Sequence, residues 1–142
     1  MNLINFKNMI IAIIGVIGSF ISYLLGGFDM ALITLLLFMA IDYITGFIVA
    51  AVFHKSNKTQ SGSLNSRAGW KGLCKKGITL LIVLVAARLD LMMGVTFIRD
   101  GVIIAYIVNE LLSIIENAGL MGVPIPKVIT KGIEALKKEV EI

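Results

Sequence analysis

The chain has few of the residues on which most catalytic and metal-binding sites depend. Its 142 residues include one cysteine, one histidine and two prolines. Cys74 cannot form an internal disulfide, and its basic neighbours favour a cytoplasmic position. Because His54 and Cys74 each stand alone, no His/Cys cluster has the spacing of metal ligands. No glycine loop ending in Lys-Ser/Thr is present to hold phosphates, and no Ser–His–Asp set can be proposed. We therefore predict that the chain is not an enzyme and has no metal or cofactor site.

Charged residues are also scarce, and hydrophobic runs take their place. Only 15% of the residues are charged and 58% are apolar, against about 45–50% apolar in soluble domains. The mean hydropathy is +0.95. A helix that spans a bilayer needs about 20 mostly apolar residues. The sequence predicts one all-α membrane domain over residues 1–142, with about four transmembrane helices and no room for a soluble catalytic domain. The expected spans are Met9–Leu25, Met30–Phe53, Leu73–Met93 and Phe97–Ile115.

The first of these runs has some features of a signal peptide. Lys7 precedes the apolar run Met9–Leu25. That run is longer than a usual signal core, and no A-x-A-like site follows it. We therefore expect an uncleaved first span.

Acidic residues are absent from the central loop His54–Gly72, whereas basic residues gather there and in the tail. These residues are Lys55, Lys58, Arg67, Lys71, Lys75, Lys76, Lys127, Lys131, Lys137 and Lys138. The positive-inside rule places loop 54–72, tail 127–142 and both termini in the cytoplasm of a multi-pass protein. The net charge of +4 then reports orientation rather than a nucleic-acid partner. Arg88 and Arg99 flank the expected outer turn and disagree with this topology, so a three-span alternative stays open.

The tail has the pattern of an amphipathic helix. The segment Gly119 to Pro126 breaks the preceding helix, because glycine is flexible and proline lacks a backbone donor. Beyond it, apolar residues recur at helical spacing between Lys and Glu, namely Ile129, Ile133, Leu136 and Val140. Two interpretations stay open: an interfacial or oligomer-contact helix, and a solvated cytoplasmic extension. Near the loop, Trp70 stands beside Lys71 and is interpreted as an interfacial anchor.

Small residues form a stripe along the first span. Gly15, Gly18, Ser19 and Ser22 fall three, four or seven residues apart, so they share one face of a helix. Small side chains let two membrane helices approach closely. We predict a tight helix–helix seam there, within or between protomers, and include Gly46 of the second span among the packing residues.

Acidic residues lie within the apolar runs, and Asp42 is the deepest of them. It stands about midway along the second span and shares a face with Thr45. A carboxylate at membrane depth costs at least ~2.5 kcal/mol on insertion scales, so it normally faces water or a partner charge. One hypothesis makes Asp42 a pore-lining or gating residue. The other pairs it with Arg88 inside one protomer.

The fourth span has a continuous polar stripe opposite an apolar face. The stripe consists of Tyr106, Asn109, Glu110, Ser113, Glu116 and Asn117. Several such helices around one axis would present a hydrated wall and an apolar outer face. We therefore take these residues, with Asp42 and Thr45, as candidates for lining or gating a pore. The alternative is a polar seam that joins helices within one bundle.

Three segments of the chain resemble the toxin-secretion and phage-lysis holin family. The first is Asp42-Tyr43-Ile44-Thr45-Gly46 and the second is the basic segment from Ser66 to Lys76. The third runs from Asn109-Glu110 to Asn117 and is followed by Gly122-Val123-Pro124-Ile125-Pro126. The matching positions are Asp42, Gly46, Lys76, Asn109, Glu110, Ser113, Glu116, Asn117, Pro124 and Pro126.

The resemblance implies a holin that accumulates in the cytoplasmic membrane of a host bacterium. Such a protein assembles with copies of itself into non-selective lesions. A phage endolysin then reaches the cell wall through them, or a toxin is secreted. The residues leave two alternatives open: a small ion- or proton-coupled transporter subunit, and a non-conducting holin antagonist or membrane scaffold.

Overall fold

The computed structural model describes residues 2–140, and the part that it describes contains helices and no strands. Helix α1 is Leu3–Leu24, α2 is Met30–Ile48, and the π-helical turn η1, Val49–Phe53, continues α2. Helices α3, α4 and α5 are Ser66–Met93, Ile98–Leu120 and Lys127–Val140. The prediction of an all-α fold is confirmed, including a helix in the tail.

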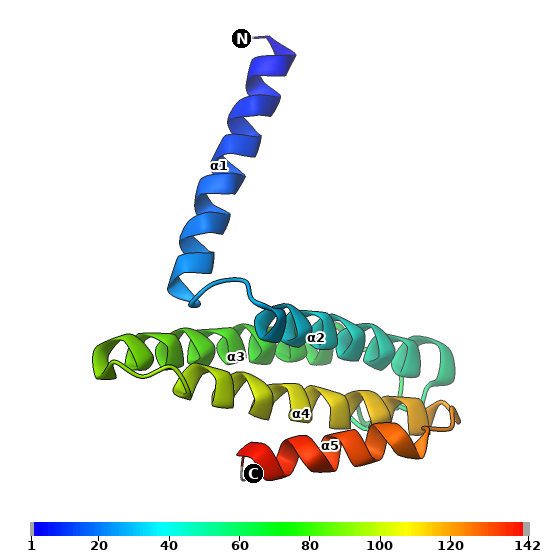
Figure 1. Ribbon diagram of the computed structural model, residues 1–142. Helices are drawn as coiled ribbons and strands as arrows, with labels where there is room; N and C mark the ends of the chain where they lie inside the picture. Colours follow the sequence, from blue (N-terminus) through cyan, green and yellow to red (C-terminus); the bar gives the residue numbers. More distant parts are fainter. Residues whose placement is uncertain (1, 141–142) are drawn as a thin grey trace.

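Helices α2, α3 and α4 lie side by side, and successive helices run in opposite directions (Figure 1). Their shared core is built from apolar residues spaced three or four apart, which places them on the inner face of each helix. The fully buried members are Leu32, Leu35, Val83 and Ile103. Tyr43 links α2 to the start of α3, since its hydroxyl donates to the Gly69 carbonyl at 3.4 Å. The bundle thus holds the second, third and fourth predicted spans together.

Helix α5 folds back along α4 (Figure 1). Ile133 on its apolar face is buried, whereas Val128 and Ile129 are exposed. The tail helix is therefore attached to the bundle by one side only.

Helix α1 leaves the bundle at a steep angle and buries none of its residues (Figure 1). The stripe of Gly15, Gly18, Ser19 and Ser22 lines a shallow groove together with Phe28. Within residues 2–140, no helix packs into this groove, because a Cβ added at Gly15 or Gly18 would meet no atom within 4 Å. The predicted seam is therefore not formed inside the described chain, and contact between protomers stays a prediction. Gly46 does lie at a helix contact, 3.6 Å from the Asn117 amide for an added Cβ.

Among residues 2–140, two helical segments are long and apolar enough to cross a membrane: Leu3–Leu24 and Met30–Phe53. Helices α3 and α4, with 28 and 23 residues, have the length but carry more charged side chains. Helix α3 also begins seven residues before the expected third span, which started at Leu73. The four-span topology therefore stays a proposal.

Candidate functional site

A buried ion-pair network connects the three bundle helices. Lys76 of α3 donates from Nζ to Asp42 Oδ2 of α2 at 2.8 Å and to Glu110 Oε2 of α4 at 2.6 Å. The side chains of Lys76, Asp42 and Glu110 are only 15%, 8% and 9% exposed. One ammonium group thus holds a carboxylate from each of the two neighbouring helices.

Asn117 of α4 adds a further hydrogen bond to the Asp42 carboxylate. Its Nδ2 donates to Asp42 Oδ1 at 3.1 Å and to Thr45 Oγ1 at 2.9 Å. We call Asp42, Thr45, Lys76, Glu110 and Asn117 the buried polar cluster. No buried side-chain nitrogen or oxygen in the described part of the chain lacks a hydrogen-bond partner. The polar side chains of the cluster therefore give one another the hydrogen-bond partners that the surrounding apolar core does not offer.

The cluster contains two carboxylates and one ammonium group. Burying an ion pair is tolerated only when geometry and further hydrogen bonds offset the loss of hydration. The two short contacts of Lys76 and the amide of Asn117 supply those bonds. Removing Lys76 would leave the buried carboxylates of Asp42 and Glu110 without a cation. The stability of the bundle therefore depends on this side chain.

The predicted Asp42–Arg88 ion pair is wrong. Because α2 and α3 are antiparallel, Asp42 in the second half of α2 lies opposite the first half of α3, where Lys76 stands. Arg88 comes twelve residues later, or ~18 Å further along the helix axis. Its side chain is exposed and makes no ion pair within residues 2–140. The sequence did offer one signal for Lys76, which belongs to the basic segment that resembles the holin motif.

The polar stripe of α4 divides between two faces. Glu110 and Asn117, seven residues apart, are buried in the cluster. Asn109 and Glu116 are also seven apart but one helical position away, and both are exposed. Glu116 accepts a hydrogen bond from Asn57 of the loop, and Tyr106 and Ser113 are half-buried. In the described chain, the stripe therefore does not form one continuous polar surface. Its buried residues, Glu110 and Asn117, form the polar seam within the bundle that was the alternative interpretation.

A second buried network, the Arg99 clamp, joins the turn before α2 to the start of α4. The Arg99 guanidinium is buried and donates to both Asp29 oxygens, at 2.7 and 3.2 Å. It also donates to the carbonyls of Leu25 and Gly27. The hydrogen bonds from Arg99 lower the pKa of Asp29. The clamp explains how Arg99 is accommodated despite its disagreement with the positive-inside pattern.

Asp90, the last acid of α3, caps the following helix. Its two carboxylate oxygens accept hydrogen bonds from the backbone N–H groups of Ile98 and Arg99, both at 3.0 Å. Asp90 thus satisfies the free donors at the beginning of α4.

Comparison with known proteins identifies relatives over most of the chain. Residues 19–138 match the model of the bacteriophage holin family. An uncharacterised protein of Clostridium perfringens is 35% identical over 125 residues, which cover 87% of each chain. An uncharacterised protein of Listeria monocytogenes is 36% identical, covering 79% of this chain and 75% of its own. A probable holin of Bacillus phage phi105 is 36% identical over 100 residues, covering 70% of this chain and 68% of its own. No solved structure matches the chain.

Proposed function

The chain belongs to the bacteriophage holin family, and from this we propose that it is a phage holin that oligomerises in the host's cytoplasmic membrane. Its assembled form opens non-selective lesions through which a phage endolysin reaches the cell wall. The family match over residues 19–138 is the observation that carries the proposal.

The distribution of polar groups supports a membrane location. The outer faces of α1 and α2 expose apolar residues such as Ile14, Leu37 and Phe47. Two buried acids of the bundle, Asp42 and Glu110, are paired with Lys76. We propose four spans, with the basic loop 54–72 and both termini in the cytoplasm. This topology requires α1 to turn at its connection to α2 from the steep angle at which it leaves the bundle (Figure 1). Helices α3 and α4 then cross the bilayer with their charged side chains turned toward one another or toward its two surfaces.

We propose that the bundle with an intact buried polar cluster is the closed form of the protein. In this form, the candidate gating residues Asp42, Thr45, Glu110 and Asn117 satisfy one another within one chain. A water-filled lesion needs polar walls, so these side chains exchange their internal partners for water or a neighbouring chain on opening. The cluster acts as a latch rather than as a preformed pore lining.

The proposal is tested by expressing the chain in bacteria together with an endolysin. We expect an abrupt loss of membrane potential, followed by release of a cytoplasmic enzyme and a fall in turbidity. Cells that express the endolysin alone supply the control. Graded ion flux without enzyme release would favour the transporter alternative. Delayed lysis on co-expression with a lytic holin would favour the antagonist.

A further inference from the structure

The first half of α3 has two parallel stripes on its surface. Lys71 and Lys75 follow Arg67 at intervals of four residues, and beside them Trp70, Cys74 and Ile78 recur at the same interval. Residues four apart lie on one face of a helix, so a basic stripe runs next to an apolar one. Except for Arg67, the residues of these two stripes line a surface groove of about 680 Å³ together with Thr79 and with Asn109 of α4.

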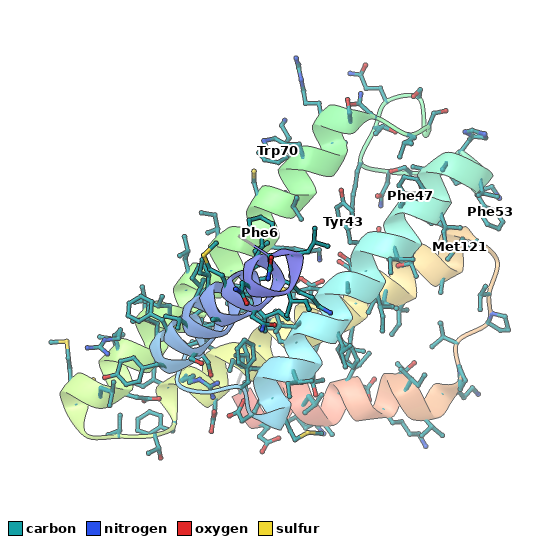
Figure 2. All side chains as sticks on the ribbon, turned by 90° about the horizontal axis from the view of Figure 1, so that it is seen from above. Phe6, Tyr43, Phe47, Phe53, Trp70 and Met121 are labelled. Atoms are coloured by element: carbon teal, nitrogen blue, oxygen red, sulfur yellow. The ribbon has the colours of Figure 1, made fainter. Side chains whose placement is uncertain are left out.

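The groove is not used by the fold. Lys71 and Lys75 are exposed and make no ion pair within the described residues, whereas the adjacent Lys76 points inward to the buried polar cluster. Trp70 and Ile78 are 67% and 57% exposed. Figure 2 labels Trp70 close to the beginning of α3. The groove thus presents two uncompensated positive charges beside apolar surface.

The length of α3 places this groove at the surface of a bilayer. Its 28 residues extend ~42 Å, whereas the hydrocarbon core is about 30 Å thick. One end of the helix must therefore reach the headgroup layer. The polar end is the one that begins at Ser66, and tryptophan is enriched at that level.

We propose that this groove binds the headgroup of an anionic phospholipid. Lys71 and Lys75 pair with the lipid phosphate, Asn109 donates a hydrogen bond from its amide, and the upper acyl chain lies along Trp70, Cys74 and Ile78. Basic pockets beside membrane helices commonly bind such headgroups. A zwitterionic lipid also has a phosphate, but its own cation balances that charge, so it would leave the net positive charge of the groove unneutralised. The inference requires only that the chain is embedded in a bilayer, and it does not depend on lesion formation.

Trp70 is the single tryptophan of the chain, so its fluorescence reports on this groove. The full chain is reconstituted in vesicles of equal parts phosphatidylglycerol and phosphatidylcholine. Bromine, which quenches tryptophan, is placed on the acyl chains of one lipid or the other. We expect stronger quenching from brominated phosphatidylglycerol, because each lysine enriches anionic lipid roughly fivefold. The double variant Lys71→Gln/Lys75→Gln should lose this preference.

The matched control, Lys127→Gln/Lys131→Gln, removes the same charge from α5 and should keep the preference. Equal quenching by the two lipids in the unmodified protein would overturn the proposal. So would an equal loss of preference in both double variants, since that would indicate general attraction to the surface.

Adding inorganic phosphate at constant ionic strength should leave the preference unchanged. If phosphate abolishes it where chloride does not, the groove binds free phosphate instead. If the protein reconstitutes normally and prefers phosphatidylglycerol but does not lyse cells, the proposed holin function fails and the lipid-binding proposal stands.

Discussion

Lys76 connects three helices through one ammonium group, and its neighbour Lys75 offers a matched comparison. We predict that Lys76→Met destabilises the bundle by about 3–5 kcal/mol, because it leaves the buried carboxylates of Asp42 and Glu110 without a cation. Lys75→Met, on the exposed side of the same turn, should change stability by less than about 0.5 kcal/mol. Thermal unfolding of the purified proteins in detergent measures both effects.

A rescue experiment separates charge from packing at this position. The triple variant Lys76→Met/Asp42→Asn/Glu110→Gln has no buried charge left at the cluster, so it should recover most of the lost stability. Similar unfolding temperatures for the Lys76→Met and triple variants would show that the side chain's packing matters more than its charge.

Asp29 makes the Arg99 clamp sensitive to pH. Because Arg99 lowers the folded-state pKa of Asp29, this carboxylate stabilises the fold above its unfolded pKa of ~3.9. That contribution is lost as the pH falls through the lower, folded pKa. We predict that the stability advantage of the wild type over Asp29→Asn shrinks between about pH 5 and about pH 3.

Asparagine suits this comparison, because Asp29 also caps α2 by accepting a hydrogen bond from the Leu32 N–H at 3.0 Å. Asparagine caps helices about as well as aspartate, so Asp29→Asn keeps the cap but removes the charge and one of the two oxygens that accept from Arg99. Unfolding temperatures of both proteins across this pH range provide the measurement, and a constant difference between them would contradict the role of the ion pair.

At the scale of whole helices, hydropathy located the elements better than their ends. Asp42 is the only charged residue in the run Met30–Phe53, and the structure makes this run α2 and η1. The start of α3 at Ser66 lies outside any apolar run. It depends on Asn65, whose side chain accepts hydrogen bonds from the N–H groups of Arg67 and Ala68. A cap of this kind leaves no mark in hydropathy.

The site was predictable only in part for a related reason. The sequence predicted that acids within its apolar runs, such as Asp42 and Glu110, face water or a partner charge. It did not identify Lys76 as that partner, because the pairing depends on how far α2 and α3 are offset when they pack antiparallel. The pattern within one helix fixes which residues share a face, but the offset between helices comes from packing in the whole core.

The connection between α1 and the bundle depends on two glycines with positive φ. Gly26 and Gly27 have φ of +81° and +99°, where other residues are strained. A Cβ at Gly26 would also lie 2.8 Å from Arg99 Nε, whereas one at Gly27 would meet nothing within 4 Å. We predict that Gly27→Ala is destabilising by about 1–2 kcal/mol through strain alone, and that Gly26→Ala is worse because it also displaces Arg99.

Limited proteolysis between α1 and α2 provides the measurement, since a disturbed clamp exposes this turn. Faster cleavage is expected for Gly26→Ala than for Gly27→Ala. The reverse order would show that the contact with Arg99 does not fix the turn.

At the scale of the whole molecule, the surface and the interior have opposite characters. Helix α1 buries none of its residues and contacts the bundle at α3, and its small-residue groove is open to a second chain. The buried polar side chains of α2, α3 and α4, within residues 2–140, instead have all their partners inside the chain. This division suggests an order of events: α1 joins copies first, while the buried polar cluster keeps each bundle closed. Because the open lesion needs these carboxylates in its polar walls, Asp42→Leu or Glu110→Leu should delay or abolish lysis without preventing insertion. Earlier lysis would contradict this wall role, and lysis on the normal schedule by both variants would exclude the cluster from the trigger.

Opening a lesion in this way requires α2 and α4 to separate, which a reversible crosslink can prevent. Thr45 Oγ1 and Asn117 Nδ2 lie 2.9 Å apart, so the ends of these side chains already touch. In a Cys74→Ser background, which removes the exposed native thiol, the pair Thr45→Cys/Asn117→Cys should form a disulfide with a membrane-permeant oxidant.

We predict that oxidised cells accumulate the protein without lysing and that added reductant restores abrupt lysis. Each single-cysteine variant, treated with the same oxidant, should lyse on its untreated schedule. Gel mobility of the membrane fraction measures the extent of crosslinking. If fully crosslinked protein still depolarises the membrane and releases a cytoplasmic enzyme on time, α2 and α4 stay together during opening. The walls of the lesion must then be formed by other surfaces, such as the exposed face of α4 with Asn109 and Glu116.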